Sequence, residues 1–226
     1  KTYTLTLPST GEEIKYRPFL MKEQKILLMA QESEKDGEVI DAMTQLITDC
    51  TFEKVDAKNC PLFDAEYIFL KLRSKSVGEK VEVNVICPDD EETRTDVSVD
   101  ISKIECNMLD DHSNIVNITD TVKIVFKYPI LSTFKSTKNT KETEMMFKMI
   151  HDCVQEIHYG EDVYNKIDMS EKDINDFVES LSTEQFKNIG KFFETMPKLR
   201  HVIQVTNPKT KVKGEILLEG LQSFLV

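Results

Sequence analysis

The side chains best suited to chemistry are two histidines and a cysteine in the second half of the chain. His151, Cys153 and His158 carry donor atoms that zinc accepts. Residues 142–159 show helical spacing, and on such a helix His151 and His158 would share a face but stand about 10 Å apart, at a rise of about 1.5 Å per residue. Zinc–nitrogen bonds are only about 2 Å long. We therefore expect ordinary core or surface residues here, and no metal site.

The cysteines offer a second kind of chemistry. Cys50 or Cys153 could act as a nucleophile only with a histidine nearby in space, and neither has a recognisable flanking signature. No two of the five cysteines form a Cys-x-x-Cys pair, which is typical of reduced, mostly buried thiols in the cytoplasm. The sequence also lacks a glycine-rich nucleotide loop and a Gly-x-Ser-x-Gly elbow. We predict no catalytic residue and no cofactor.

The charge of the chain limits its partners. Its 226 residues include 29 basic and 40 acidic ones, a net charge of −11. An acidic chain repels phosphates, so we expect no nucleic-acid partner. Apolar runs fall short of the roughly 20 residues that a membrane helix needs, so we expect no membrane partner. Ten acids lie between Asp89 and Asp120, and they indicate either solvated loops or a surface for a basic partner.

The elements that must position these residues are both strands and helices. Period-two alternation predicts a hairpin over 2–18 and strands at 81–85, 97–101, 116–119 and 122–126, the last two joined by a turn around Asp120. It also predicts a final hairpin over 201–218. Helical spacing predicts helices over 22–36, ended by Gly37, and over 39–50, 64–75 and 142–159. Ser170 and Ser182 are typical caps of two further helices. The predicted fold class is α+β.

Four sections follow from this order of elements. Residues 1–79 form an amino-terminal hairpin with helices, residues 80–129 are rich in strands, and residues 130–198 are helical. Residues 199–226 form a carboxy-terminal hairpin that returns to the strand-rich section. We expect this hairpin to pair near residues 81–101, because an isolated two-stranded ribbon is marginally stable in water.

Six segments together resemble one protein family. They occur in the same order along nearly the whole chain and cover residues 14–20, 23–30, 50–52, 63–79, 192–199 and 218–224. This ordered set is similar to the baseplate hub proteins of T-even-like contractile-tailed bacteriophages. The resemblance implies a non-enzymatic tail protein, a structural or assembly subunit of the baseplate hub that acts through protein–protein interfaces. Its partners would be other baseplate or tail proteins, with an oligomer as a further possibility. It would work in the host cytoplasm during assembly and in the virion tail baseplate.

The same resemblance draws attention to two turns. Many proteins of this family carry Cys-Pro-x-Cys knuckles at two β-turns, which together suggest a zinc ribbon. The matching turns of this chain begin at Cys87 and Asn207 and retain the proline. Of the four ligand positions, only position 87 holds a cysteine. The other three are occupied by Asp90, Asn207 and Thr210. The resemblance therefore implies a degenerate zinc-ribbon-like arrangement without metal, held by packing and turn hydrogen bonds.

Interface residues are expected near both ends of the chain. Large aromatic and apolar side chains commonly anchor protein interfaces, and the candidates are Tyr16, Arg17, Phe19, Leu221, Phe224 and Leu225. The alternative for each is that it only closes the core. Two other functions stay open. One is a transient tail-assembly chaperone for the tape measure or another hub component. The other is a cell-wall hydrolase, which would need two carboxyl groups about 5 to 9 Å apart.

Overall fold

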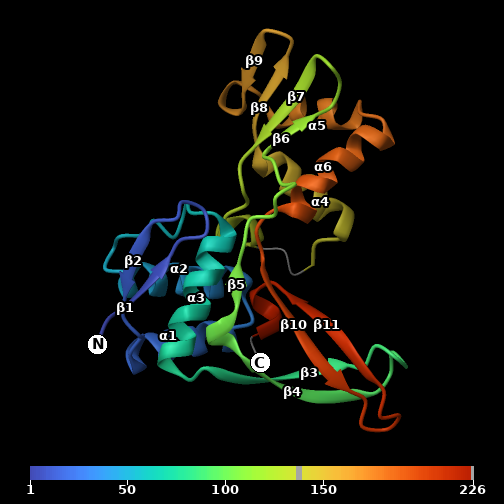
Figure 1. Ribbon diagram of the computed structural model, residues 1–226. Coiled ribbons are helices and arrows are strands. Elements are labelled where there is room, and N and C mark those ends of the chain that lie inside the picture. Colours follow the sequence, from blue (N-terminus) through green and yellow to red (C-terminus); the bar gives the residue numbers. More distant parts are fainter. Residues whose placement is uncertain (136–138, 225–226) are drawn as a thin grey trace. The chain divides into compact units, whose positions relative to one another are not determined.

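The computed structural model describes residues 1–135 and 139–224 and divides the chain into two compact units (Figure 1). Unit 1 comprises residues 1–34, 38–107 and 197–226, and unit 2 comprises residues 35–37 and 108–196. Most of unit 2 is therefore an insertion between two parts of unit 1. Both units combine helices with small antiparallel sheets, which confirms the predicted α+β class.

The amino-terminal part of unit 1 is a hairpin followed by helices. Strands β1 (Tyr3–Thr6) and β2 (Glu13–Tyr16) pair antiparallel, and α1 (Met21–Glu32), α2 (Asp36–Cys50) and α3 (Leu62–Ser76) follow. Helix α3 lies in the core and buries Ile68, Leu70 and Leu72 completely. The predicted helix stop at Gly37 is wrong: Glu34 takes the left-handed conformation with φ 57°, and Gly37 lies in the first turn of α2. The reason is that only three residues separate α1 from α2.

Two long hairpins complete unit 1. Strands β3 (Lys80–Ile86) and β4 (Arg94–Asp100) form one, and β10 (Leu199–Thr206) and β11 (Lys213–Glu219) form the other. Figure 1 shows them side by side, with their turns at the same end. Strand β10 also pairs with the short strand β5 (Glu105–Cys106), which corrects the expected pairing near residues 81–101. The 3-10 turns η1 (Ile101–Lys103) and η4 (Leu221–Phe224) follow β4 and β11.

Alternation of side chains explains the two long hairpins. Every second residue of β3 is buried, namely Val81, Val83 and Val85, and Ile203 and Val205 of β10 follow the same rule. The residues between them are exposed. Each hairpin therefore has one apolar face that must be covered.

Unit 2 contains a four-stranded antiparallel sheet in the order β6-β7-β8-β9. Its strands are β6 (Ile115–Asn117), β7 (Val122–Phe126), β8 (Val154–Tyr159) and β9 (Asp162–Asn165). Helices α4 (Glu142–Cys153), α5 (Glu171–Glu179) and α6 (Thr183–Thr195) accompany it, with the 3-10 turns η2 (Leu131–Phe134) and η3 (Lys166–Asp168). The predicted caps are confirmed: the hydroxyls of Ser170 and Ser182 each accept a hydrogen bond from the backbone amide three residues further on.

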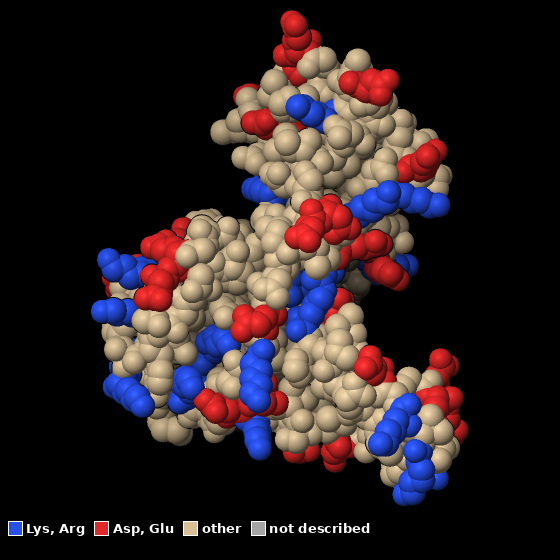
Figure 2. Space-filling view, in the orientation of Figure 1, with Lys and Arg blue, Asp and Glu red and all other residues tan. Residues whose placement is uncertain are grey.

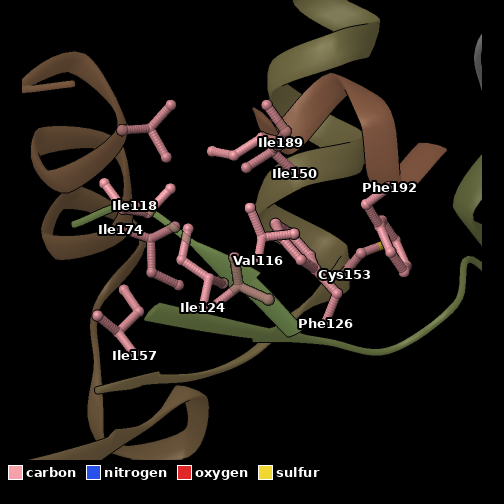
Figure 3. Close-up of a cluster of buried hydrophobic side chains, with 12 residues drawn as sticks. Val116, Ile118, Ile124, Phe126, Ile150, Cys153, Ile157, Ile174, Ile189 and Phe192 are labelled. Carbon is pink, nitrogen blue, oxygen red and sulfur yellow. The ribbon is translucent and has the colours of Figure 1, made fainter. Parts of the chain in front are cut away.

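Side chains from the strands and helices form the core of unit 2 (Figure 3). Ile124 of β7, Ile150 of α4 and Ile189 of α6 are among its buried members. The rings of Phe126 and Phe192 stack with their centroids 4.7 Å apart. This core joins both ends of the insertion, since Phe126 lies near its start and Phe192 near its end.

The last third of the predicted helix over 142–159 is wrong. Helix α4 ends at Cys153, and residues 154–159 form β8. This strand pairs with β7 on one side and β9 on the other and buries Val154 and Ile157. Hydrogen bonding to two neighbouring strands outweighs the local helical spacing, which is a weak preference. The division of the sequence into four sections stays a prediction.

Candidate functional site

The two turns singled out by the sequence have the same backbone geometry. Between β3 and β4, the amide of Glu91 donates to the carbonyl of Cys87 at 3.0 Å. Between β10 and β11, the amide of Lys211 donates to the carbonyl of Asn207 at 2.8 Å. Glu91 and Lys211 are both left-handed, with φ 53° and 64°. The turns are therefore matched, although only one of them keeps a cysteine.

The amino-terminal hairpin repeats the same turn. There the amide of Gly11 donates to the carbonyl of Leu7 at 2.9 Å, and Gly11 has φ 73°. Proline occupies the second position of all three turns, as Pro8, Pro88 and Pro208. Proline fixes the φ that this position needs. The proline spacing is visible in the sequence, but sequence analysis misses the repeat because the left-handed residues of the other two turns are not glycine.

Hydrogen bonds between side chains join the two long hairpins at their turns. The amide nitrogen Nδ2 of Asn207 donates to Asp89 Oδ1 at 2.9 Å and to Asp90 Oδ2 at 2.8 Å. The hydroxyl of Thr210 donates to Asp89 Oδ2 at 2.6 Å. Asn207 is only 1% exposed. We name Asp89, Asp90, Asn207 and Thr210 the turn clamp.

Residues of the turn clamp also shape their own turns. Asn207 Oδ1 accepts hydrogen bonds from the amides of Lys209 at 2.9 Å and Thr210 at 3.2 Å. Asp90 accepts from the hydroxyl and amide of Thr93, and these bonds hold the pKa of Asp90 well below its usual range. Hydrogen bonds from Thr210 and Asn207 lower the pKa of Asp89. Each carboxylate therefore stays charged and serves as an acceptor for several donors.

The predicted knuckle positions come together, but with chemistry unlike that of a zinc site. Asp90, Asn207 and Thr210 lie in the turn clamp, and Cys87 is buried at the start of its turn. Within residues 1–135 and 139–224, no three His, Cys, Asp or Glu side chains gather closely enough to hold a metal ion. Asn207 and Thr210 donate hydrogen bonds to the carboxylate oxygens of Asp89 and Asp90, which are the atoms that would otherwise coordinate a metal ion. The absence of zinc stays a prediction.

The turns also approach closely through their backbones. A Cβ atom at Gly214 of β11 would lie 2.8 Å from Cγ of Pro88, which is inside the van der Waals limit. The missing side chain of Gly214 lets the proline ring of one turn rest on the strand of the other hairpin. Packing and hydrogen bonding therefore join the hairpins together.

Most of the predicted interface residues are buried in unit 1. Tyr16, Phe19, Leu221 and Phe224 belong to its core, and Phe224 is completely buried. The amide of Leu221 donates to a carboxylate oxygen of Glu66 on α3 at 2.7 Å. Leu225 lies outside the described residues. A role for these side chains in an interface stays a prediction, and in this structure they stabilise the unit itself.

Arg17 has a local partner. Its guanidinium donates to both carboxylate oxygens of Glu23, at 2.6 and 3.0 Å. Glu23 also accepts a hydrogen bond from the amide of Leu20 at 2.6 Å and is buried. Pairing with Arg17 lowers the pKa of Glu23. This pair connects the end of the amino-terminal hairpin to the first turn of α1.

The residues considered for metal binding or nucleophilic catalysis lie on different elements, because α4 ends at Cys153. His151 remains on the helix next to Asp152, while His158 lies on β8 and contacts Glu156 at 2.7 Å. Burial raises the pKa of Cys153 to about 12 and, together with the nearby carboxylate of Glu23, the pKa of Cys50 to about 11. Thiols with such pKa values are neutral and weakly nucleophilic at pH 7.

The acids between 89 and 120 have varied surroundings. Asp96 accepts a hydrogen bond from Asn84 at 2.8 Å, and Asp100 caps η1 by accepting from the amide of Ser102 at 3.0 Å. Figure 2 shows acidic and basic side chains together at the free end of the two long hairpins. A surface for a basic partner stays a prediction.

Exposed apolar side chains occur where the sequence did not predict them. One group lies on and beside α1 and consists of Leu20, Met21, Ile26, Leu28 and Met29. A second lies at the β8–β9 hairpin and just after it and consists of Tyr159, Val163, Tyr164 and Ile167. The sequence predicts a helix here, but a helical pattern shows which residues share a face and not which face the fold covers.

Comparison with known proteins identifies the family. All residues from 1 to 226 match the family model described as T4 bacteriophage base plate protein. No curated protein and no solved structure matches the chain. In the part of the chain that the structure describes, no helix has the length and apolar character to cross a membrane. Because the family model extends over both units, the chain belongs to the T4 bacteriophage base plate protein family, a family of phage tail proteins.

Proposed function

We propose that this chain is a non-enzymatic structural or assembly subunit of the baseplate hub and acts through protein–protein interfaces. The observation that carries this proposal is the match of one baseplate family model to every residue of the chain. The match includes both compact units. A single family therefore accounts for both, and neither unit needs a separate activity. The other baseplate and tail proteins are the partners, and assembly takes place in the host cytoplasm.

The turn clamp supports a role in which surfaces keep a fixed shape. It joins turns that are more than a hundred residues apart in the sequence and so holds two hairpins in one relative position. A surface that is already ordered loses less conformational entropy when it binds. A subunit that must meet its neighbours in one register benefits from such rigidity.

The thiol chemistry also supports a non-enzymatic role. Burial is the largest cause of the raised pKa of Cys50, Cys60, Cys106 and Cys153, which lie at about 11 or 12. These thiols are protonated at neutral pH, and those of Cys50, Cys106 and Cys153 fill space in the core.

Quantitative analysis of tails tests this proposal. Baseplates and complete tails are purified from cells infected with wild-type phage and with phage carrying a stop codon in this gene. Isotope-labelled peptides of the chain then give its copy number per baseplate. We expect a constant whole-number copy number in wild-type baseplates, chemical cross-links to other hub proteins, and no complete baseplate without the chain. A plasmid copy of the wild-type gene should restore assembly.

Two results would overturn the proposal in different directions. Presence in assembly intermediates together with absence from finished tails would identify a transient chaperone. Turnover of purified peptidoglycan by the isolated chain would identify a cell-wall hydrolase.

A further inference from the structure

Helix α1 exposes much of its apolar surface. Glu23 and Ala30 are its buried residues. In contrast, Met21 is 71% exposed, Met29 58%, and Leu28 46%. Single exposed apolar residues are common, but several on one side of one helix indicate a binding surface.

The exposed residues form a stripe with a regular pattern. At 100° per residue, Met21, Lys25, Leu28 and Glu32 lie within about 60° of one another, and Met29 adjoins them. Glu23 and Ala30 point to the opposite side. Leu28 and Met29 therefore form the apolar centre of the stripe. Lys25 lies on the amino-terminal side of this centre, and Glu32 lies on its carboxy-terminal side.

The charges on this stripe are self-complementary. Lys25 and Glu32 are seven residues apart, about 10 Å along the axis and on nearly the same line. Neither forms an ion pair with another residue of the described parts of the chain. If a second α1 lies antiparallel, with the two-fold axis between residues 28 and 29, residue i faces residue 57 − i. Lys25 then faces Glu32 of the second copy, and Leu28 faces Met29.

From this pattern we propose that α1 pairs antiparallel with α1 of a second copy of this chain. Two equivalent ion pairs then enclose an apolar centre made of two leucines and two methionines. The symmetry explains why opposite charges stand at equal distances from the centre, whereas an unrelated partner would need no such spacing. The interaction is an isologous contact of the kind that closes a dimer.

The length of α1 limits how strongly two copies of the chain can associate. Helix α1 has 12 residues and is therefore about 18 Å long. A contact confined to two helices of this length is small compared with the roughly 1,000 Å² that a stable interface buries, so the pairing is a weak one. We therefore expect association at tens to hundreds of micromolar. The inference does not depend on the proposed function, because a chain that stays monomeric in solution could still be a hub subunit.

Analytical ultracentrifugation of the full chain from about 5 to 500 µM tests the pairing. The average mass of the wild-type chain should rise from 26.1 kDa toward twice that value. Leu28→Lys should abolish the rise. Val163→Lys, at a side chain exposed to a similar extent in unit 2, should leave it unchanged. Circular dichroism confirms that each variant is folded.

Charge reversal tests the antiparallel register. Lys25→Glu or Glu32→Lys alone should reduce the association constant roughly tenfold, because each places like charges opposite each other. An equimolar mixture of these two variants should associate like the wild-type chain, since both ion pairs then form between unlike copies. The double variant should also associate.

Three results would refute the pairing. The wild-type chain stays monomeric throughout the concentration range, Leu28→Lys leaves the dimer intact, or the mixture of charge variants fails to associate. If the chain is monomeric and Leu28→Lys still blocks its entry into baseplates, the stripe binds a different tail protein and the proposed second copy is wrong.

Discussion

Asn207→Ala should separate the two long hairpins of unit 1. The substitution removes the only side chain of the turn clamp that is fully buried, and with it the hydrogen bonds from Nδ2 to Asp89 and Asp90. It also removes the acceptor that holds the amides of Lys209 and Thr210. The cost therefore has two parts, one between the hairpins and one within the turn.

The magnitude follows from four lost hydrogen bonds. A typical bond contributes about 0.5 to 1.5 kcal/mol to stability. Asp89 and Asp90 are exposed, so water can take the place of the lost donors at their carboxylates. We therefore use the lower half of this range of free energy per hydrogen bond. Asn207→Ala should lower the free energy of unfolding of unit 1 by about 2 to 4 kcal/mol. A matched control is Asn84→Ala. The exposed amide of Asn84 donates to Asp96 and accepts from Arg94 within one hairpin, so losing both solvent-exposed bonds should cost no more than about 1 kcal/mol.

Asn207→Asp separates the two parts of the cost. The new carboxyl group keeps an acceptor for the turn amides but faces the carboxylates of Asp89 and Asp90. Repulsion raises the pKa of the new group, so its destabilising effect is present at neutral pH and declines as the pH falls and the group becomes protonated. The difference from wild type should therefore be smaller at pH 4 than at pH 7.

Hydrogen exchange measured by mass spectrometry is the assay, because the sequence contains no tryptophan and the two units can unfold separately. Peptides from 80–100 and 199–219 should lose protection by about 30- to 900-fold in Asn207→Ala, at about 1.4 kcal/mol per factor of ten. Peptides from unit 2 serve as the internal reference. Unchanged protection of both hairpins would show that the turn clamp does not hold them together.

Three other predictions concern separate parts of the molecule. Glu23→Gln should lower the free energy of unfolding by about 1 to 3 kcal/mol in urea titrations, because it weakens the two-bond contact with Arg17, and no change would show that the pair is energetically neutral. Burial lowers the pKa of His112, although the negative charge of Asp111 opposes this shift. The stability that neutral His112 contributes is therefore complete above the unfolded pKa of about 6.5, and it is lost as the pH falls through the lower pKa of the folded state. Protection of residues 115–126 should therefore decline more between pH 7 and pH 5 in the wild-type chain than in His112→Gln, and equal declines would contradict this. Elemental analysis of the purified chain should find far less than one zinc per molecule, whereas one tightly held zinc would contradict the prediction of a chain without metal.

Local chemistry was enough to predict many of the elements. The capping serines Ser170 and Ser182 form their hydrogen bonds within three residues, so their effect does not depend on the rest of the fold. The alternation of Val81, Val83 and Val85 likewise specifies a strand with one covered face. The ordered segments shared with the baseplate family also indicated the family that the whole-chain match shows.

Contacts between distant residues decided the rest. Residues 154–159 form β8 because two other strands are available to pair with them, which no local pattern reveals. Whether Tyr16 and Phe224 are buried while Met21 and Met29 are exposed depends on which surfaces the helices cover. Types and spacing show which residues share a face, but only the fold shows what lies against that face.

The turn clamp illustrates both contributions. The sequence by itself determined that two proline-containing turns exist and that three of their four knuckle positions hold no cysteine. The tertiary structure decided that Asn207 reaches Asp89 and Asp90, more than a hundred residues away, and donates hydrogen bonds to their carboxylates. The physical reason is that a turn forms from a few neighbouring residues, whereas the partner of a buried side chain is set by the packing of the whole unit.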